Sequence, residues 1–182
     1  MTVPNKFTTN GALPAGDHKA TLADIRASIL VKGEESPSPD WDRDWRAHCV
    51  DNLEIMAGQL WQIGITKIFI NGSFVENKDH PNDIDGYFDC DFMKFASGQL
   101  ETELNLLDPH KIWTWDPKER RHYRGYAKAQ LPMWHQYRVE LWPNFGQPFG
   151  IKDTAGNSLN FAQAFRISRT NNLPKGIIEL VR

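Results

Sequence analysis

The stretch TKIFINGSFVENKDHPNDIDGYFDC, residues 66–90, contains two short apolar segments joined by a polar loop. Residues 66–70 are rich in β-branched side chains and predict a strand that ends just before a Gly-Ser pair. Residues 83–90 predict a second strand. Asp83 and Asp85 lie one residue apart on it, so they point to the same side. The stretch therefore places a carboxylate pair next to a glycine-containing turn.

These residue types suit phosphate chemistry. Two carboxylates held close together repel each other, so a cation is needed to keep both ionised. Oxygen ligands alone favour Mg²⁺ or Mn²⁺ over zinc. Gly72 allows the backbone to approach a ligand closely, and Ser73 adds a hydroxyl donor. A phosphate cradle beside a pair of metal-binding carboxylates is what nucleotidyl transfer requires.

Two common motifs that resemble this stretch do not fit it. The sequence Asp-Ile-Asp-Gly, residues 83–86, is similar to the middle of an EF-hand loop, but Pro81 and Phe92 then occupy the first and last ligand positions. Those positions require Asp and Glu. A P-loop is excluded because no Gly-Lys-Ser or Gly-Lys-Thr follows the glycine.

The rest of the 182 residues predicts one domain of mixed secondary structure. An apolar residue recurs every three or four positions over 42–63, which is typical of an amphipathic helix. Further helices are expected at 91–107, 118–130 and 158–168, and a third strand at 137–142. We expect an α+β fold of two layers, a small mixed β-sheet with helices mainly on one face. Residues 1–16 are expected to form a flexible leader and 17–182 a single domain.

The spacing of Gly72-Ser73 and Asp83-x-Asp85 resembles the DNA polymerase β nucleotidyltransferase superfamily. The segments LPAGDHKAT (13–21), GSFV (72–75) and PNDID (81–85) are similar to a family of small, poorly characterised prokaryotic members. The resemblance covers about a third of the chain and implies a nucleotidyltransferase-like fold. Gly86 departs from the pattern, because an apolar residue usually follows the second aspartate.

The resemblance also implies a third carboxylate on a later strand. Glu140 is the first candidate, because strand alternation would place it on the open face with Asp83 and Asp85. Asp89 is the second. The alternative for Glu140 is a solvated position beside Arg138.

A basic segment supplies candidate phosphate ligands. Arg120, Arg124 and Lys128 recur every four residues, so a helix over 118–130 would gather them on one face. Arg124 and Lys128 are expected to bind the nucleotide phosphates together with Gly72 and Ser73. A nucleic-acid backbone or a simply solvated face are the alternatives.

The activity that the resemblance implies is transfer of a nucleoside monophosphate from a nucleoside triphosphate to a protein or RNA hydroxyl, with Mg²⁺ or Mn²⁺. A toxin–antitoxin or phage-defence role, with a cognate protein partner, is implied in the same way. One alternative is a non-catalytic protein of the same fold that acts through a partner. Another is a nuclease, which would leave the Gly-Ser pair without a task.

Composition limits these functions further. The net charge of −2 argues against binding nucleic acid through bulk charge, and no apolar run is long enough to cross a bilayer. The two cysteines are far apart and have no metal-like spacing. We therefore expect a cytoplasmic protein with no membrane partner and no structural zinc.

Overall fold

A five-stranded mixed sheet forms the centre of the computed structural model, which describes residues 3–153, 155–168 and 172–182. The strand order is β1-β7-β2-β3-β4. Their bounds are β1 Gly16–Ala20, β7 Gly176–Leu180, β2 Ile68–Asn71, β3 Ile84–Asp89 and β4 Val139–Asn144. β7 runs parallel to β1, β3 runs parallel to β4, and β2 is antiparallel to both of its neighbours. The predicted small mixed sheet is confirmed.

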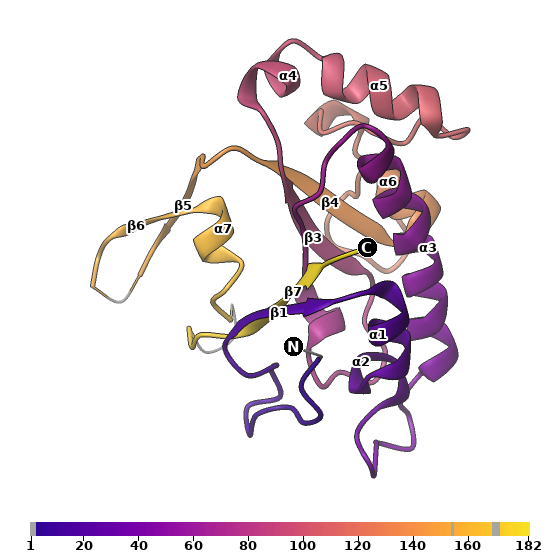
Figure 1. The fold of residues 1–182 in the computed structure, drawn as a ribbon, viewed down its shortest axis with the longest axis vertical. Coiled ribbons are helices and arrows are strands. Elements are labelled where there is room, and N and C mark those ends of the chain that lie inside the picture. Colours follow the sequence, from indigo (N-terminus) through magenta and orange to yellow (C-terminus); the bar gives the residue numbers. More distant parts are fainter. Residues whose placement is uncertain (1–2, 154, 169–171) are drawn as a thin grey trace.

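Helices cover one face of this sheet (Figure 1). They are α1 Leu22–Ala27, α2 Ile29–Lys32, α3 Arg43–Gln62, α5 Gln99–Leu107 and α6 Pro132–Tyr137. α3 is the longest and supplies an apolar stripe to the main core, with Cys49, Val50, Leu53, Met56 and Leu60 fully buried. The sheet side chains that face this layer are also buried and apolar, among them Ile68, Ile70, Ile84, Val139 and Leu141. The expected two-layer α+β architecture is therefore confirmed.

A smaller unit covers part of the opposite face, which we call the open face (Figure 1). It consists of β5 Pro148–Lys152, β6 Ser158–Asn160 and α7 Phe161–Ala164. Its aromatic side chains pack on the sheet, and Tyr87 makes edge contacts with Phe161 and Phe165. Arg166 fastens the unit by donating to both carboxylate oxygens of Asp17 and to the hydroxyl of Tyr87.

Three expected elements differ from the structure. The helix over 91–107 is two helices, α4 Phe92–Ala96 and α5, because Gly98 adopts φ +76° between them. The helix over 158–168 is only α7, preceded by β6. The basic helix over 118–130 does not form. A single 3₁₀ turn at Pro117–Glu119 is followed by a loop that an Arg121–Gln130 bridge closes.

The segment expected as a flexible leader packs against the domain over its described residues. Val3, Ala12 and Leu13 are buried, and the amide of Phe7 donates to Glu34. Residues 1–2 lie outside the described part of the chain. Among the described residues, no helix combines the length and apolar character needed to cross a bilayer.

Candidate active site on the open face

The strand register sets a polar row across the open face. Asn71 on β2 pairs with Asp85 on β3, and Asp85 pairs with Glu140 on β4. Neighbouring strands are roughly 4.8 Å apart, so these side chains are neighbours on one surface. The next row is aromatic, formed by Phe69, Tyr87 and Trp142. The predicted orientation of Asp85 and Glu140 toward a common face follows from this register.

Two adjoining hollows follow this polar row and share Asp85, Phe149 and Phe165. We call them together the cleft. The first has a volume of about 230 Å³ and is also lined by Asn71, Gly72, Ser73, Glu76, Ala164, Ile167 and Lys175. The second has a volume of about 510 Å³ and is also lined by Asp83, Arg120, Lys128, Gln130, Glu140, Trp142 and Phe161. The cleft thus joins the Gly-Ser turn to all three candidate carboxylates.

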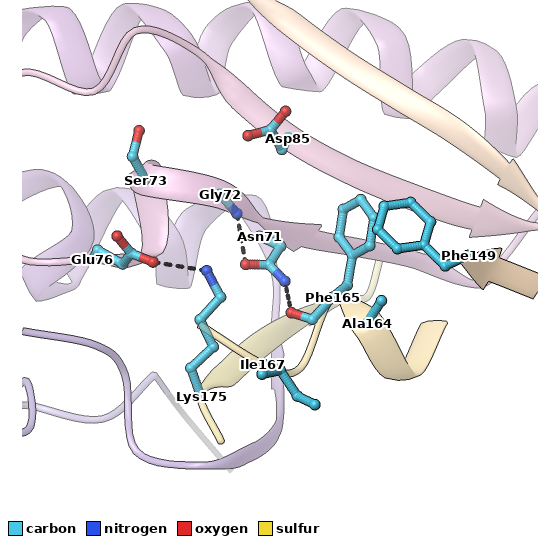
Figure 2. A pocket seen from close by; sticks show the side chains of 10 residues that line it. All are labelled: Asn71, Gly72, Ser73, Glu76, Asp85, Phe149, Ala164, Phe165, Ile167 and Lys175. Atoms are coloured by element: carbon cyan, nitrogen blue, oxygen red, sulfur yellow. Dashed lines mark hydrogen bonds and ion pairs between the residues drawn. The ribbon is translucent and has the colours of Figure 1, made fainter. Parts of the chain in front are cut away.

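Gly72 is required because the Asp85 side chain lies directly over it (Figure 2). A Cβ at this position would come within 2.3 Å of the Asp85 Oδ2 atom and 2.9 Å of its Cβ. Gly72 also has φ +74°, a conformation that L side chains rarely adopt. Its amide donates to Asn71 Oδ1 at 2.6 Å, and the Asn71 amide group donates to the carbonyl of Phe165. The turn is therefore built around the second carboxylate.

Gly86, the departure from the superfamily pattern, also has a steric reason. A Cβ there would come within 2.4 Å of the Phe69 carbonyl oxygen and 2.8 Å of a Leu141 methyl group. The absence of a side chain lets β2 and β4 pack closely on β3 directly after Asp85.

Asp83 is held by an indole. The Trp134 Nε1 atom donates to Asp83 Oδ2 at 2.6 Å, and the Trp134 ring itself is buried. The guanidinium of Arg138 lies 3.8 Å from the centre of that ring. Burial raises the pKa of the Asp83 carboxyl, while the indole bond and the charges of Lys78 and Arg138 oppose the rise. Asp83 is thus a desolvated carboxylate in a fixed orientation.

Glu140 is held in a similar way. It is 8% exposed, and its Oε1 atom accepts from the Trp142 indole at 2.9 Å. The guanidinium of Arg120 lies 3.6 Å from the same oxygen. Burial raises the pKa of the Glu140 carboxyl and the charge of Asp83 adds to this, whereas Arg120 and Trp142 oppose it. Glu140 is thus a buried carboxylate whose ionised form is favoured by Arg120 and Trp142 and disfavoured by the charge of Asp83.

The donor chemistry of the cleft fits a hard divalent cation, because Asp83, Asp85 and Glu140 offer only oxygen atoms. Each indole occupies one oxygen of its carboxylate, so the second oxygen of Asp83 and of Glu140 is the atom suited to a metal. In the described ranges, no group of three or more His, Cys, Asp or Glu side chains is drawn together as a metal-binding cluster. The carboxylates therefore share a cleft without closing around a common point.

The basic segment, residues 118–130, supplies a different set of cleft residues from the one predicted. Arg120 and Lys128 line the cleft, whereas Arg124 is exposed and is not among the lining residues. The three side chains share no helix face, because the segment is a loop. Asp89, the second candidate for the third carboxylate, lies at the far end of β3, where it accepts from Asn144 at 2.6 Å.

Lys175 is a cleft residue that the sequence reasoning missed. It precedes β7, is 7% exposed, and pairs with Glu76 at 2.7 Å (Figure 2). The available signal was a lysine directly before a buried apolar strand, a position where a charged side chain needs a partner.

Arg46 of α3 fixes the loop that follows the Gly-Ser turn. This fully buried guanidinium donates to the backbone carbonyls of Leu30, Phe74, Glu76 and Lys78. It lies 3.9 Å from the centre of the Trp41 ring. Burial lowers its pKa to about 10, well above neutral pH, so the group remains charged.

Fold and cleft together define a class: an α+β domain whose mixed sheet carries a carboxylate-lined cleft on its open face. A family model matches residues 5–181, and the chain belongs to this family, DUF6932, which is described as a family of unknown function. No curated protein and no solved structure matches the chain.

Proposed function

We propose that this protein is a metal-dependent nucleotidyltransferase that moves a nucleoside monophosphate from a nucleoside triphosphate to a protein or RNA hydroxyl. One observation carries the proposal: Asp83, Asp85 and Glu140 line one cleft, which continues to the Gly-Ser turn. The nucleotidyltransferase-like fold and the DNA polymerase β resemblance belong to the same proposal.

The three carboxylates would hold Mg²⁺ or Mn²⁺. When bound, the divalent ions lower the pKa of the acceptor hydroxyl and offset the charge that develops on the phosphates. Burial raises the pKa of Asp83 and of Glu140, and the charge of Asp83 adds to the rise at Glu140, so a divalent cation would favour the ionised form of both carboxylates.

The chain's own groups would orient the reactants. Gly72 lets the backbone come close to a phosphate, and Ser73 provides a hydroxyl donor beside it. Arg120 and Lys128 supply positive charge at the opposite end of the cleft. The acceptor hydroxyl gives up its proton to solvent, its oxygen forms a bond to the α-phosphorus, the bond from this phosphorus to the bridging oxygen breaks, and pyrophosphate leaves. Positioning by these groups is their contribution to the rate.

The biological setting rests on the resemblance alone. A toxin–antitoxin or phage-defence pair would supply both an acceptor and a cognate protein partner. A cytoplasmic location is in keeping with Cys49 and Cys90, which are both free thiols.

A second candidate is a non-catalytic protein of the same fold that acts through a protein partner. The indole and guanidinium contacts to Asp83 and Glu140 favour it, because they satisfy these carboxylates without a metal. The two candidates differ in whether Mg²⁺ or Mn²⁺ binds and whether a nucleotide is transferred.

The test is a labelling assay. The full chain is incubated with Mg²⁺ or Mn²⁺, a lysate, and each of the four nucleoside triphosphates labelled at the α-phosphate. The proposal expects one protein or RNA to become labelled, and expects the label to disappear with Asp83→Asn/Asp85→Asn. Asp89→Asn is the matched control, because Asp89 is a carboxylate of the same strand outside the cleft. Labelling that survives in the double variant would refute the catalytic role.

A further inference from the structure

The ion pair between Lys175 and Glu76 sits inside the smaller hollow of the cleft. The Lys175 Nζ atom lies 2.7 Å from Glu76 Oε1, next to the turn formed by Asn71, Gly72 and Ser73 (Figure 2). Lys175 comes from the segment before β7 and Glu76 from the loop after the Gly-Ser turn, 99 positions apart. The pair therefore joins two distant parts of the chain at the site itself.

The two charged side chains differ in how much of each is exposed to solvent. The side chain of Lys175 is 8% exposed, whereas that of Glu76 is 32% exposed. An ammonium group at this depth has lost most of its hydration and depends on a nearby anion. Glu76 is still partly hydrated, so it loses less when the pair separates. The lysine needs an anion, and the glutamate is a replaceable one.

The hollow has one cation among its described lining residues, and this is Lys175. The other charged groups there are the carboxylates of Glu76 and Asp85. A polyanion that enters this end therefore competes with Glu76 for the donors of Lys175.

We propose that Lys175 binds the β- and γ-phosphates of the nucleoside triphosphate by exchanging Glu76 for phosphate oxygens, and that Glu76 sets the selectivity for a triphosphate over a monophosphate. This inference rests on the proposed function. A terminal phosphate carries more negative charge than a carboxylate and can replace it, whereas a monophosphate held near the carboxylates of the larger hollow does not reach Lys175.

The exchange also orients the substrate. The triphosphate tail lies at the Gly72 end, and the α-phosphate lies near Asp85, which lines both hollows. The nucleoside then occupies the larger hollow, where Trp142, Phe149 and Phe161 offer aromatic surface.

Two substitutions with opposite expected effects test the exchange. Binding of the Mg²⁺ complex of each α,β-methylene nucleoside triphosphate, and of the corresponding monophosphate, is measured by calorimetry. Lys175→Met is expected to weaken triphosphate binding by about ten- to a hundredfold, the range for a hydrogen bond to a charged group. Glu76→Gln is expected to strengthen triphosphate binding, because Lys175 no longer has a charged competitor. Monophosphate affinity should stay the same in both variants.

Two further variants control for fold and for general charge. Lys175→Met/Glu76→Gln removes both charges of the ion pair, so no buried charge is left without a partner to destabilise the fold. This double variant should bind the triphosphate as weakly as Lys175→Met. Lys67→Met breaks an ion pair of similar length outside the cleft, to Glu179 at 2.9 Å, in which the lysine is exposed, and this variant should bind like the wild type.

The outcomes separate the two proposals. If the wild type binds none of the triphosphate analogues, the proposed function fails, and this inference fails with it. If the wild type binds one of them but Lys175→Met and Glu76→Gln keep its triphosphate-to-monophosphate affinity ratio, only the exchange is refuted. The same holds if both variants shift that ratio in the same direction.

Discussion

Replacing Gly72 by alanine tests whether the turn is built around Asp85. The added Cβ would lie 2.3 Å from Asp85 Oδ2, far inside van der Waals contact, and the backbone would remain at φ +74°. The left-handed conformation costs an L residue roughly 1–2 kcal/mol. Overpacking typically adds about 1–3 kcal/mol. Gly72→Ala should therefore lower the free energy of unfolding by about 2–5 kcal/mol and displace the Asp85 carboxylate.

Gly98→Ala separates the two contributions, because Gly98 has nearly the same φ, +76°, and no atom within 4 Å of its Cβ position. This variant should lose only the backbone part, roughly 1–2 kcal/mol. Urea unfolding of both variants measures the difference, and labelling activity should fall only in Gly72→Ala. If Gly72→Ala were no less stable than Gly98→Ala, the contact between the turn and Asp85 would have no energetic role.

Three further predictions concern the carboxylates. Asp83→Asn/Asp85→Asn should abolish labelling while the free energy of unfolding stays the same or rises, since it removes like charges from the cleft; a large drop in thermal stability would contradict this. Because burial raises the pKa of Glu140, its native form binds a proton more tightly than its unfolded form. Its contribution to stability is therefore greatest at low pH and falls as pH rises from about 4 through the raised pKa. Glu140→Gln should flatten this decline in urea titrations across that range, and an identical pH dependence would refute the assignment. Trp134→Phe removes the indole donor that lowers the Asp83 pKa, so the carboxyl should titrate at higher pH by NMR, and an unchanged pKa would show that the bond has no effect.

The spacing of apolar residues in the sequence correctly predicted those helices and strands in which the apolar residues are the buried ones. The helix expected over 42–63 is observed as Arg43–Gln62, because its apolar residues recur on one face and Asp42 caps its first turn. Strand alternation likewise placed Asp85 and Glu140 on the open face, since Ile84 next to Asp85, and Val139 and Leu141 on either side of Glu140, are buried in the main core.

The basic segment shows where periodicity misleads. Charges every four residues over 120–128 have helical spacing, but the segment has no apolar stripe to bury, and Gly125 interrupts it. Without tertiary packing, a short helix is not stable in water. In the observed loop, the backbone amides and carbonyls of Arg121 and Gln130 pair with each other instead.

The pairing of strands that are far apart in the sequence could not be predicted from local sequence patterns. Residues 16–20 form a strand because they pair in parallel with residues 176–180, at the other end of the chain. The antiparallel pairing of β7 with β2 likewise places Lys175 beside the Gly-Ser turn, a neighbour more than 100 positions away in sequence. No local periodicity carries information about such a contact.

The attachment of Arg46 limits which lengths of the connecting loop the domain can tolerate. One guanidinium holds alternate carbonyls at Phe74, Glu76 and Lys78, so an insertion between these residues would break the alternation and leave some of these carbonyls without their donor. Beyond Lys78 the loop is held again at Asp79 and Pro81, whose carbonyls accept from the Asp42 amide and the Trp45 indole, so the connection can grow most freely at the exposed Asn82. Relatives with a longer gap between the Gly-Ser turn and the aspartate pair should carry their extra residues there.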